Sequence, residues 1–352
     1  MKIKSVFLLG PALLLASALF AQAQGVPTMG PTIAPTPMTE KEVITELKKE
    51  GAEQLKQDLK KRGVDFSMDP DVEKRLRKAK ATDEVIQAVT AATPKEKAAA
   101  AKAAAMASGQ VVVPAEETAD LKALQTELDP DKGIALAEAY VKKFPQSPVL
   151  TYVYAYEAHS YQMKNDAIKV VEYAEKSLGL KKDNLDSLMT AASVIPMAQF
   201  LHEHQSDQEQ QLDKAEAYCR EALKGIDQLK KPPTMDDAQF ASRKASAIAG
   251  VHASLGLIHY DRASLGLMGW DKDELAKAEK EYQLAVTLTD RPDPSDYYRM
   301  GAVYTQEGKL DDAIAAFTKA SELGQGLVKQ LADQQIELVK KAKAQSGAPA
   351  KP

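Results

Sequence analysis

Small and aromatic residues recur at fixed spacing from about residue 115 onward, and this repetition limits the possible folds strongly. The clearest copy of the pattern covers residues 293–326. Gly301 and Tyr304 lie on a predicted first helix, Gly308 forms a turn, and Ala313 and Phe317 lie on a predicted second helix. Because one such hairpin cannot bury its apolar face alone, the pattern predicts a stack of helical hairpins.

Weaker copies of the pattern precede this one. One predicted first helix begins at Thr151, the next begins 34 residues later at Leu185, and a third contains Leu255. In each predicted second helix, small or apolar residues follow one another at similar offsets. The residues expected to hold the hairpins together are Gly256, Ala278, Gly301, Tyr304, Ala313, Phe317 and Ala320.

The last copy resembles the tetratricopeptide repeat (TPR). Tyr297, Met300, Gly301 and Tyr304 match its first helix, with Tyr in place of Trp and Met in place of Leu. The phrase at residues 144–148 resembles the turns between repeats in bacterial envelope proteins. The resemblance implies an all-α, TPR-type helical-hairpin solenoid of the bacterial cell envelope, closed by a capping helix with a polar outer face.

Two turns of the predicted solenoid are longer than the repeat requires, at residues 199–211 and 261–273. Insertions in a solenoid map to loops or extended helices at one face. Trp270 lies in the second insertion, and we expect it to clasp that turn, because large aromatic side chains are mostly buried. The alternative is that Trp270 is an exposed anchor.

The N-terminus has the pattern of an export signal. Lys2 and Lys4 precede an apolar stretch from Val6 to Phe20, and the small residues at positions 21 and 23 predict cleavage before Gln24. The apolar stretch is short for a membrane span, although an uncleaved anchor is the alternative. No Cys stands near the cleavage point, so we expect a periplasmic or secreted protein without a lipid anchor or an integral span after cleavage.

The chain divides by composition into six predicted segments. These are a signal peptide (1–23), a Pro-rich linker (24–38), a small helical module (39–93), an Ala/Lys-rich helical spacer (94–115), the TPR-like solenoid (116–345) and a disordered tail (346–352). Ala and Lys are strong helix formers, which makes the spacer semi-rigid.

Helix-capping residues mark the boundaries within the small module. Thr39 and Glu42 form a predicted capping box, Gly63 ends a helix, and Pro70 and Thr82 begin two others. The phrases at residues 62–66 and 80–86 resemble a small helical module that accompanies repeat domains in bacterial proteins. That resemblance implies no chemistry, and we expect a packing or docking domain.

Composition and motifs argue against several functional classes. A net charge of −4 is unsuited to a nucleic-acid binder, and the single Cys219 excludes an intramolecular disulfide. His202 and His204 are two residues apart and point to different helix faces, so we expect no metal site there. Phosphate-binding, dinucleotide-binding and nucleophile-elbow motifs are missing from the sequence. We therefore expect no catalytic residues, no metal and no cofactor, with Cys219 and His259 buried in the core.

The predicted partner surface is the concave groove lined by first helices. Repeat spacing places Tyr152, His159, Met163, Met189, Tyr260, Tyr298 and Gln306 there. The Lys and Asn residues with which related TPR proteins capture peptide carboxylates are missing, so an extended or helical protein segment is the expected ligand. The alternative is that these side chains pack on neighbouring helices and bind nothing.

These expectations predict a non-catalytic scaffold or adaptor that binds other proteins in the periplasm. Two other classes stay open: an assembly chaperone for outer-membrane or secreted clients, and a hydrolase or metal-dependent enzyme with an unrecognised site. The sequence names neither the partner nor the oligomeric state.

Overall fold

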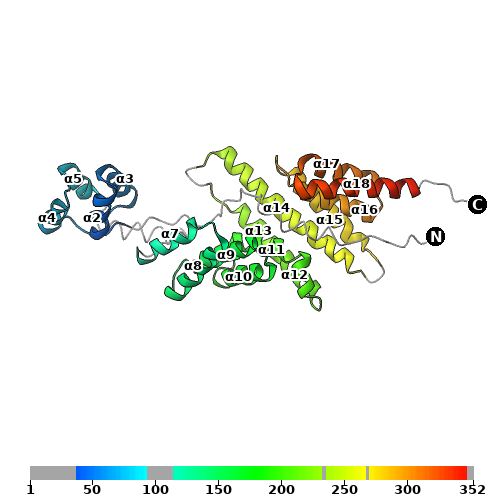
Figure 1. Ribbon diagram of the computed structural model, residues 1–352, viewed down its shortest axis with the longest axis horizontal. Coiled ribbons are helices and arrows are strands. Elements are labelled where there is room, and N and C mark those ends of the chain that lie inside the picture. The colour runs from blue at the N-terminus through cyan, green and yellow to red at the C-terminus, as the bar shows by residue number, and fades with distance from the viewer. Residues whose placement is uncertain (1–36, 93–112, 114, 232–234, 267–268, 347–352) are drawn as a thin grey trace, which may run out of the picture. The chain divides into compact units, whose positions relative to one another are not determined.

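The computed structural model describes residues 37–92, 113, 115–231, 235–266 and 269–346. Helices account for nearly all regular structure in this part of the chain, which confirms the all-α prediction (Figure 1). The predicted signal peptide, nearly all of the Pro-rich linker, most of the spacer and nearly all of the tail lie outside the described residues. No helix in the described ranges is long and apolar enough to cross a membrane.

The small module contains four helices whose ends follow the predicted capping residues. They are α2 (Glu40–Lys49), α3 (Ala52–Arg62), α4 (Pro70–Lys78) and α5 (Asp83–Ala91). Thr39 and Glu42 form the predicted capping box at the start of α2. Gly63 follows α3 with a φ of 67°, a conformation that favours glycine. Thr82 caps α5 through the backbone N–H of Val85.

The module has a hydrophobic core of its own. Val43, Leu55, Leu76 and Val85 are fully buried within it. The backbone of Met38 pairs with Gly63 and Asp65 and fixes the entry of the chain into α2. The module is therefore a folded unit of amphipathic helices, as its apolar periodicity predicts.

The described chain forms two compact units. One comprises the chain up to Glu127 together with Glu138–Leu150, and the other comprises Leu128–Ala137 and the chain from Thr151 onward. The first unit also holds the 3-10 turn η2 (Ala115–Glu117) and α7 (Thr118–Thr126), and α8 (Pro130–Lys143) contributes to both. The six-segment division drawn from composition stays a prediction.

A buried carboxylate fixes the turn that follows α8. Tyr140 and Ser147 both donate hydrogen bonds to Glu117, at 2.6 and 2.5 Å. Ser147 also accepts the backbone N–H of Val149. Burial, followed by the bond to Glu117, raises the pKa of Tyr140 above its ordinary value, so this phenol stays protonated and holds the turn.

The larger unit is a series of helical hairpins. Its helices are α9 (Leu150–Met163), α10 (Ala167–Leu180), α11 (Leu185–Val194), α12 (Ala198–Glu203), α13 (Gln208–Asp227), α14 (Asp237–Ser264), α15 (Lys272–Thr287), α16 (Pro294–Glu307), α17 (Leu310–Leu323) and α18 (Gly326–Ser346). From α13 to α18 each helix packs on the next along the chain. The predicted first and second helices are α9 and α10, α11 and α13, α14 and α15, and α16 and α17.

Two glycines show why the hairpins close as the repeat predicts. A Cβ atom on Gly301 would lie 2.8 Å from the ring of Phe317, and one on Gly256 would lie 2.9 Å from the ring of Tyr282. Ala278, Ala313 and Ala320 are fully buried at the same helix contacts. In these two hairpins, a glycine on the first helix lets an aromatic ring of the second helix approach closely.

The long helix α14 links two hydrophobic cores. Val251, Leu255 and Ile258 belong to a core shared with helices α9 to α13. Leu257, Tyr260 and Ala263 contact or belong to a core shared with α15 to α18. The polar residues His259, Asp261 and Arg262 lie on the same part of α14. The first lengthened turn, predicted at 199–211, includes most of the short helix α12, and the second, predicted at 261–273, begins within the last turn of the 28-residue helix α14.

Candidate protein-binding surface

The residues predicted to contact a partner lie on the first helices of the hairpins. Tyr152, His159 and Met163 are on α9, Met189 is on α11, Tyr260 is on α14, and Tyr298 and Gln306 are on α16. His159 and Met163 are exposed, Tyr298 is buried, and the other four residues are half-buried. We call the residues on α9 and α11 the accessible group, and those on α14 and α16, which contact aromatic and amide side chains of this chain, the enclosed group. Contact of any of them with a partner stays a prediction.

The accessible group contains the largest exposed apolar side chain among the predicted residues. Met163 is 41% exposed and His159 is also exposed, whereas Tyr152 and Met189 are half-buried. Tyr152, His159 and Met163 follow one another at intervals of seven and four residues, so they share one side of α9. The flexible thioether of Met163 offers an apolar surface that adapts to different ligands.

The hydroxyl group of Tyr152 lies inside the protein. Its oxygen is buried and has no hydrogen-bond partner in the described residues. Burial raises the pKa of Tyr152 to about 12, and the nearby carboxylates of Asp186 and Asp183 add to the effect. Tyr152 is therefore a neutral phenol on α9 whose side chain is half-buried.

The enclosed group is filled by side chains of the chain itself. The ring of Tyr260 packs on Trp270, with 5.0 Å between centroids, and Gln306 hydrogen-bonds to the same tyrosine. Tyr298 is only 3% exposed, meets Phe317 edge-on at 5.3 Å and is hydrogen-bonded by Gln335. A partner reaches Tyr298 only if these side chains move. Trp270 behaves as the predicted clasp of the lengthened turn.

Buried charges lie next to the enclosed group. The Arg299 guanidinium is 3.3 Å from Asp296 on the same helix, and Asp261 of α14 also faces it. Burial raises the pKa of Asp296 to about 7 and that of Asp261 well above its ordinary value. One oxygen of Asp261 and the hydroxyl of Tyr282 are buried without a hydrogen-bond partner among the described residues. The junction of α14, α15 and α16 therefore favours the protonated form of both aspartates.

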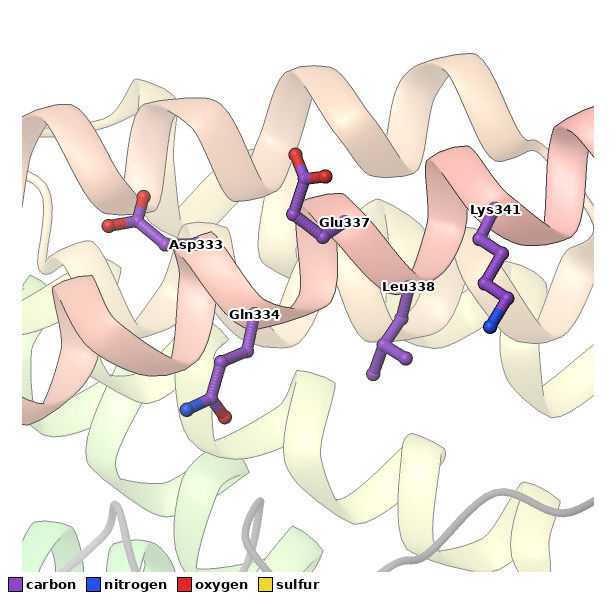
Figure 2. Close-up of a pocket in the computed structure, with 5 residues that line it drawn as sticks. All are labelled: Asp333, Gln334, Glu337, Leu338 and Lys341. Atoms are coloured by element: carbon purple, nitrogen blue, oxygen red, sulfur yellow. The ribbon is translucent and has the colours of Figure 1, made fainter.

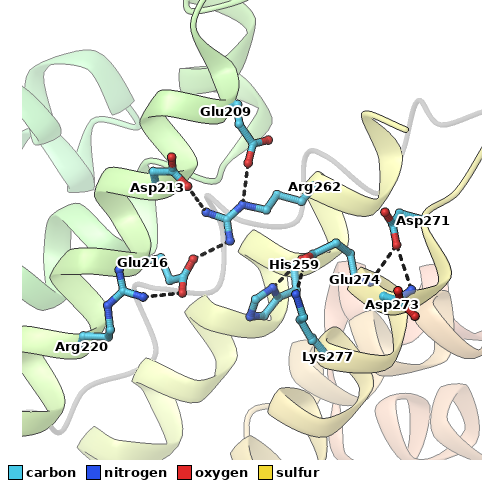
Figure 3. Close-up of polar contacts among 10 residues, drawn as sticks. All are labelled: Glu209, Asp213, Glu216, Arg220, His259, Arg262, Asp271, Asp273, Glu274 and Lys277. Carbon is cyan, nitrogen blue, oxygen red and sulfur yellow. Dashed lines mark hydrogen bonds and ion pairs between the residues drawn. The ribbon is translucent and has the colours of Figure 1, made fainter. Parts of the chain in front are cut away.

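Arg262 joins α14 to α13 through three carboxylates, an arrangement that Figure 3 shows. Its guanidinium donates to Glu209 at 3.0 Å, to Asp213 at 2.6 Å and to Glu216 at 2.5 Å. Burial alone would raise the pKa of Glu216, but the hydrogen bond and charge of Arg262 lower it. The 4- and 3-residue spacing of the acids along α13 is visible in the sequence, but their arginine lies 46–53 residues away.

Two histidines join α14 to α15 in the same way. His259 contacts Glu274 at 2.7 Å, and His252 contacts Glu281 at 2.6 Å. The packed, hydrogen-bonded state expected for His259 is confirmed by this contact (Figure 3). The sequence analysis missed His252, although the seven-residue spacing of the histidines equals that of the two glutamates. These pairs bridge helices and are structural contacts.

The other residues considered for metal binding or catalysis, His202, His204 and Cys219, make only local or core contacts. His202 is exposed and contacts Gln205, whereas His204 stacks on Phe200 with 4.2 Å between ring centroids. The thiol of Cys219 is fully buried, as expected, and burial raises its pKa to about 12. Within the described ranges, no group of three or more His, Cys, Asp or Glu residues is arranged to hold a metal ion.

Comparisons with known proteins add little to this picture. No family model matches the chain, and no curated protein matches it. Among solved structures, it is similar to a thermophilic TPR protein of Thermus thermophilus, with a TM-score of 0.38 and 19% identity over 62% of this chain and 94% of that chain. It is also similar to yeast Tom70, with a TM-score of 0.33 and 12% identity over 96% of this chain and 71% of that chain.

Proposed function

We propose that this protein is a non-catalytic scaffold that binds a segment of another protein through the exposed side of α9 and the neighbouring face of α11. The observation that carries the proposal is the difference between the two groups of first-helix residues. His159 and Met163 are exposed on α9, whereas Tyr260 and Tyr298 are enclosed by the chain's own side chains.

The chemistry of this surface favours an apolar protein segment as the ligand. Met163, Met189 and the accessible part of Tyr152 supply contact area without charge. Small-molecule chemistry has less support, because His252, His259 and Arg262 on the first helix α14 are engaged in contacts with neighbouring helices. The proposed location is the periplasm, on the strength of the export signal predicted at residues 1–23.

The experiment compares capture of envelope proteins by matched single variants. Met163→Asp on α9 is expected to remove the bound partner, because the substitution places a charge within the apolar surface. Ile168→Asp on α10 is the control, since Ile168 is similarly exposed but lies on a second helix. Tyr260 and Tyr298 are unsuitable for this test because their substitution would disturb the core.

The outcomes separate the proposed function from its alternatives. Loss of one defined partner with Met163→Asp, and its retention with Ile168→Asp, supports the scaffold. Weak binding of many unfolded outer-membrane chains would instead favour a chaperone. Retention of the partner by Met163→Asp would place the binding surface elsewhere. Mass spectrometry of the secreted form tests the location and should show a chain that begins at Gln24.

A further inference from the structure

The last helix, α18, has one face in the core and one face that carries an exposed apolar residue. Val328, Ala332 and Val339 are buried against the helices before it. On another side, Leu338 is 52% exposed and lines a hollow with Asp333, Gln334, Glu337 and Lys341. A capping helix normally carries a polar outer face, so Leu338 departs from the rule.

Figure 2 shows Gln334, Leu338 and Lys341 projecting from one side of α18. Leu327, also exposed, precedes Gln334 by seven residues. The intervals of seven, four and three residues place these side chains in one stripe along the helix, with the spacing of a helix–helix contact. The stripe therefore has the form of a surface on which another helix would pack.

Around Leu338 the charges of α18 change sign, because Asp333 and Glu337 precede it and Lys340, Lys341 and Lys343 follow it. Lys329, one turn before Asp333, pairs with that carboxylate, and Lys343 pairs with Asp311 of α17. Two copies of this helix packed antiparallel about Leu338 would place the acidic part of each against the basic part of the other. Parallel packing would place like charges together. Because pairing of opposite charges favours one orientation, the helix is complementary to itself.

We propose that α18 is a self-association surface on which two copies of this chain pack antiparallel, with their Leu338 side chains in contact at the two-fold axis. Glu337 of each copy pairs with Lys340 or Lys341 of the other. The ion pair between Glu337 and Lys340 within one copy is exposed, so replacing it by a pair between copies costs little free energy. The contact is short and the dimer is accordingly weak.

Sedimentation velocity over a range of protein concentrations tests the proposal. The wild type should show a reversible monomer–dimer equilibrium, and Leu338→Asp should lower the association constant at least about tenfold. Leu323→Asp is the matched control, since Leu323 is 51% exposed but lies at the end of α17. Circular dichroism of both variants verifies the fold.

Charge-reversal variants test the proposed antiparallel pairing most sharply. Glu337→Lys makes this part of α18 more basic, and the double variant Lys340→Glu/Lys341→Glu makes it more acidic. Each protein alone should associate more weakly than the wild type, and a mixture of the two should form a mixed dimer. A wild type that stays monomeric, or variants that associate equally well alone and mixed, would overturn the proposal. A helix from a different protein would then be the remaining occupant.

Discussion

Arg299 and Asp296 lie one turn apart on α16, and the guanidinium is 3.3 Å from the carboxylate inside the protein. Despite this neighbour, burial raises the pKa of Asp296 from 3.8 to about 7. The desolvation of Asp296 therefore outweighs its attraction to Arg299. This balance makes the stability of the solenoid depend on pH.

We expect the contribution of Asp296 to the free energy of unfolding to decrease as the pH rises from about 4 to about 7. The folded protein holds a proton on Asp296 in this range, whereas the unfolded chain releases it, so folding is favoured at low pH. Asp296→Asn should remove this part of the dependence and stabilise the protein at pH 8 by roughly 1–4 kcal/mol. Urea unfolding of both proteins at several pH values measures this pH dependence. If the two free energies of unfolding differ by the same amount at every pH, Asp296 does not cause it.

Gly301→Ala should destabilise the solenoid by about 1–3 kcal/mol, because the added methyl group would lie 2.8 Å from the ring of Phe317. Gly250→Ala is the matched control on α14. A Cβ there meets no atom within 4 Å, and replacing a helical glycine by alanine usually stabilises by about 0.5–1 kcal/mol. Thermal unfolding of the two variants should shift in opposite directions. Equal shifts would show that the hairpin is not closed at Gly301.

Arg262→Gln should destabilise the contact between α13 and α14 by roughly 1–3 kcal/mol. The substitution leaves Glu209, Asp213 and Glu216 without their shared cation, whose side chain is 11% exposed. Arg220→Gln provides the comparison, since Arg220 is mostly exposed and pairs only with Glu216 in the described chain. Its loss should change stability by less than about 0.5 kcal/mol. Similar losses for both variants would contradict the interhelical role of Arg262.

The Cys219 thiol should react slowly with a disulfide reagent in the folded protein and rapidly in urea. Its side chain is fully buried, and burial raises its pKa to about 12, so very little thiolate is present at pH 8. Absorbance after addition of the reagent gives both rates. Fast labelling without denaturant would mean that the hairpin of α11 and α13 opens readily.

The sequence predicted local structure well because capping and close packing are short-range effects. Thr39, Gly63 and Thr82 end or begin helices as expected, and Gly301 meets Phe317 sixteen residues later in the same hairpin. Each of these outcomes depends on neighbours within one or two helices.

The partner surface was less predictable because it depends on distant segments. Repeat spacing placed Tyr260 and Tyr298 with Met163, but Trp270 from a lengthened turn and Gln335 from the last helix lie against the two tyrosines. The ion pairs of Arg262 were not predicted either, because they depend on three carboxylates that lie on another helix. Spacing within one helix does not specify such pairings.

Site-specific photo-crosslinking in cells tests the proposed partner surface most directly. A photoreactive amino acid replaces Met163 on α9, Met189 on α11 or Ile168 on α10 in separate full-length proteins. We predict that positions 163 and 189 form an adduct with the same envelope protein and that position 168 does not. Adducts confined to position 168, or equal at all three positions, would contradict the account.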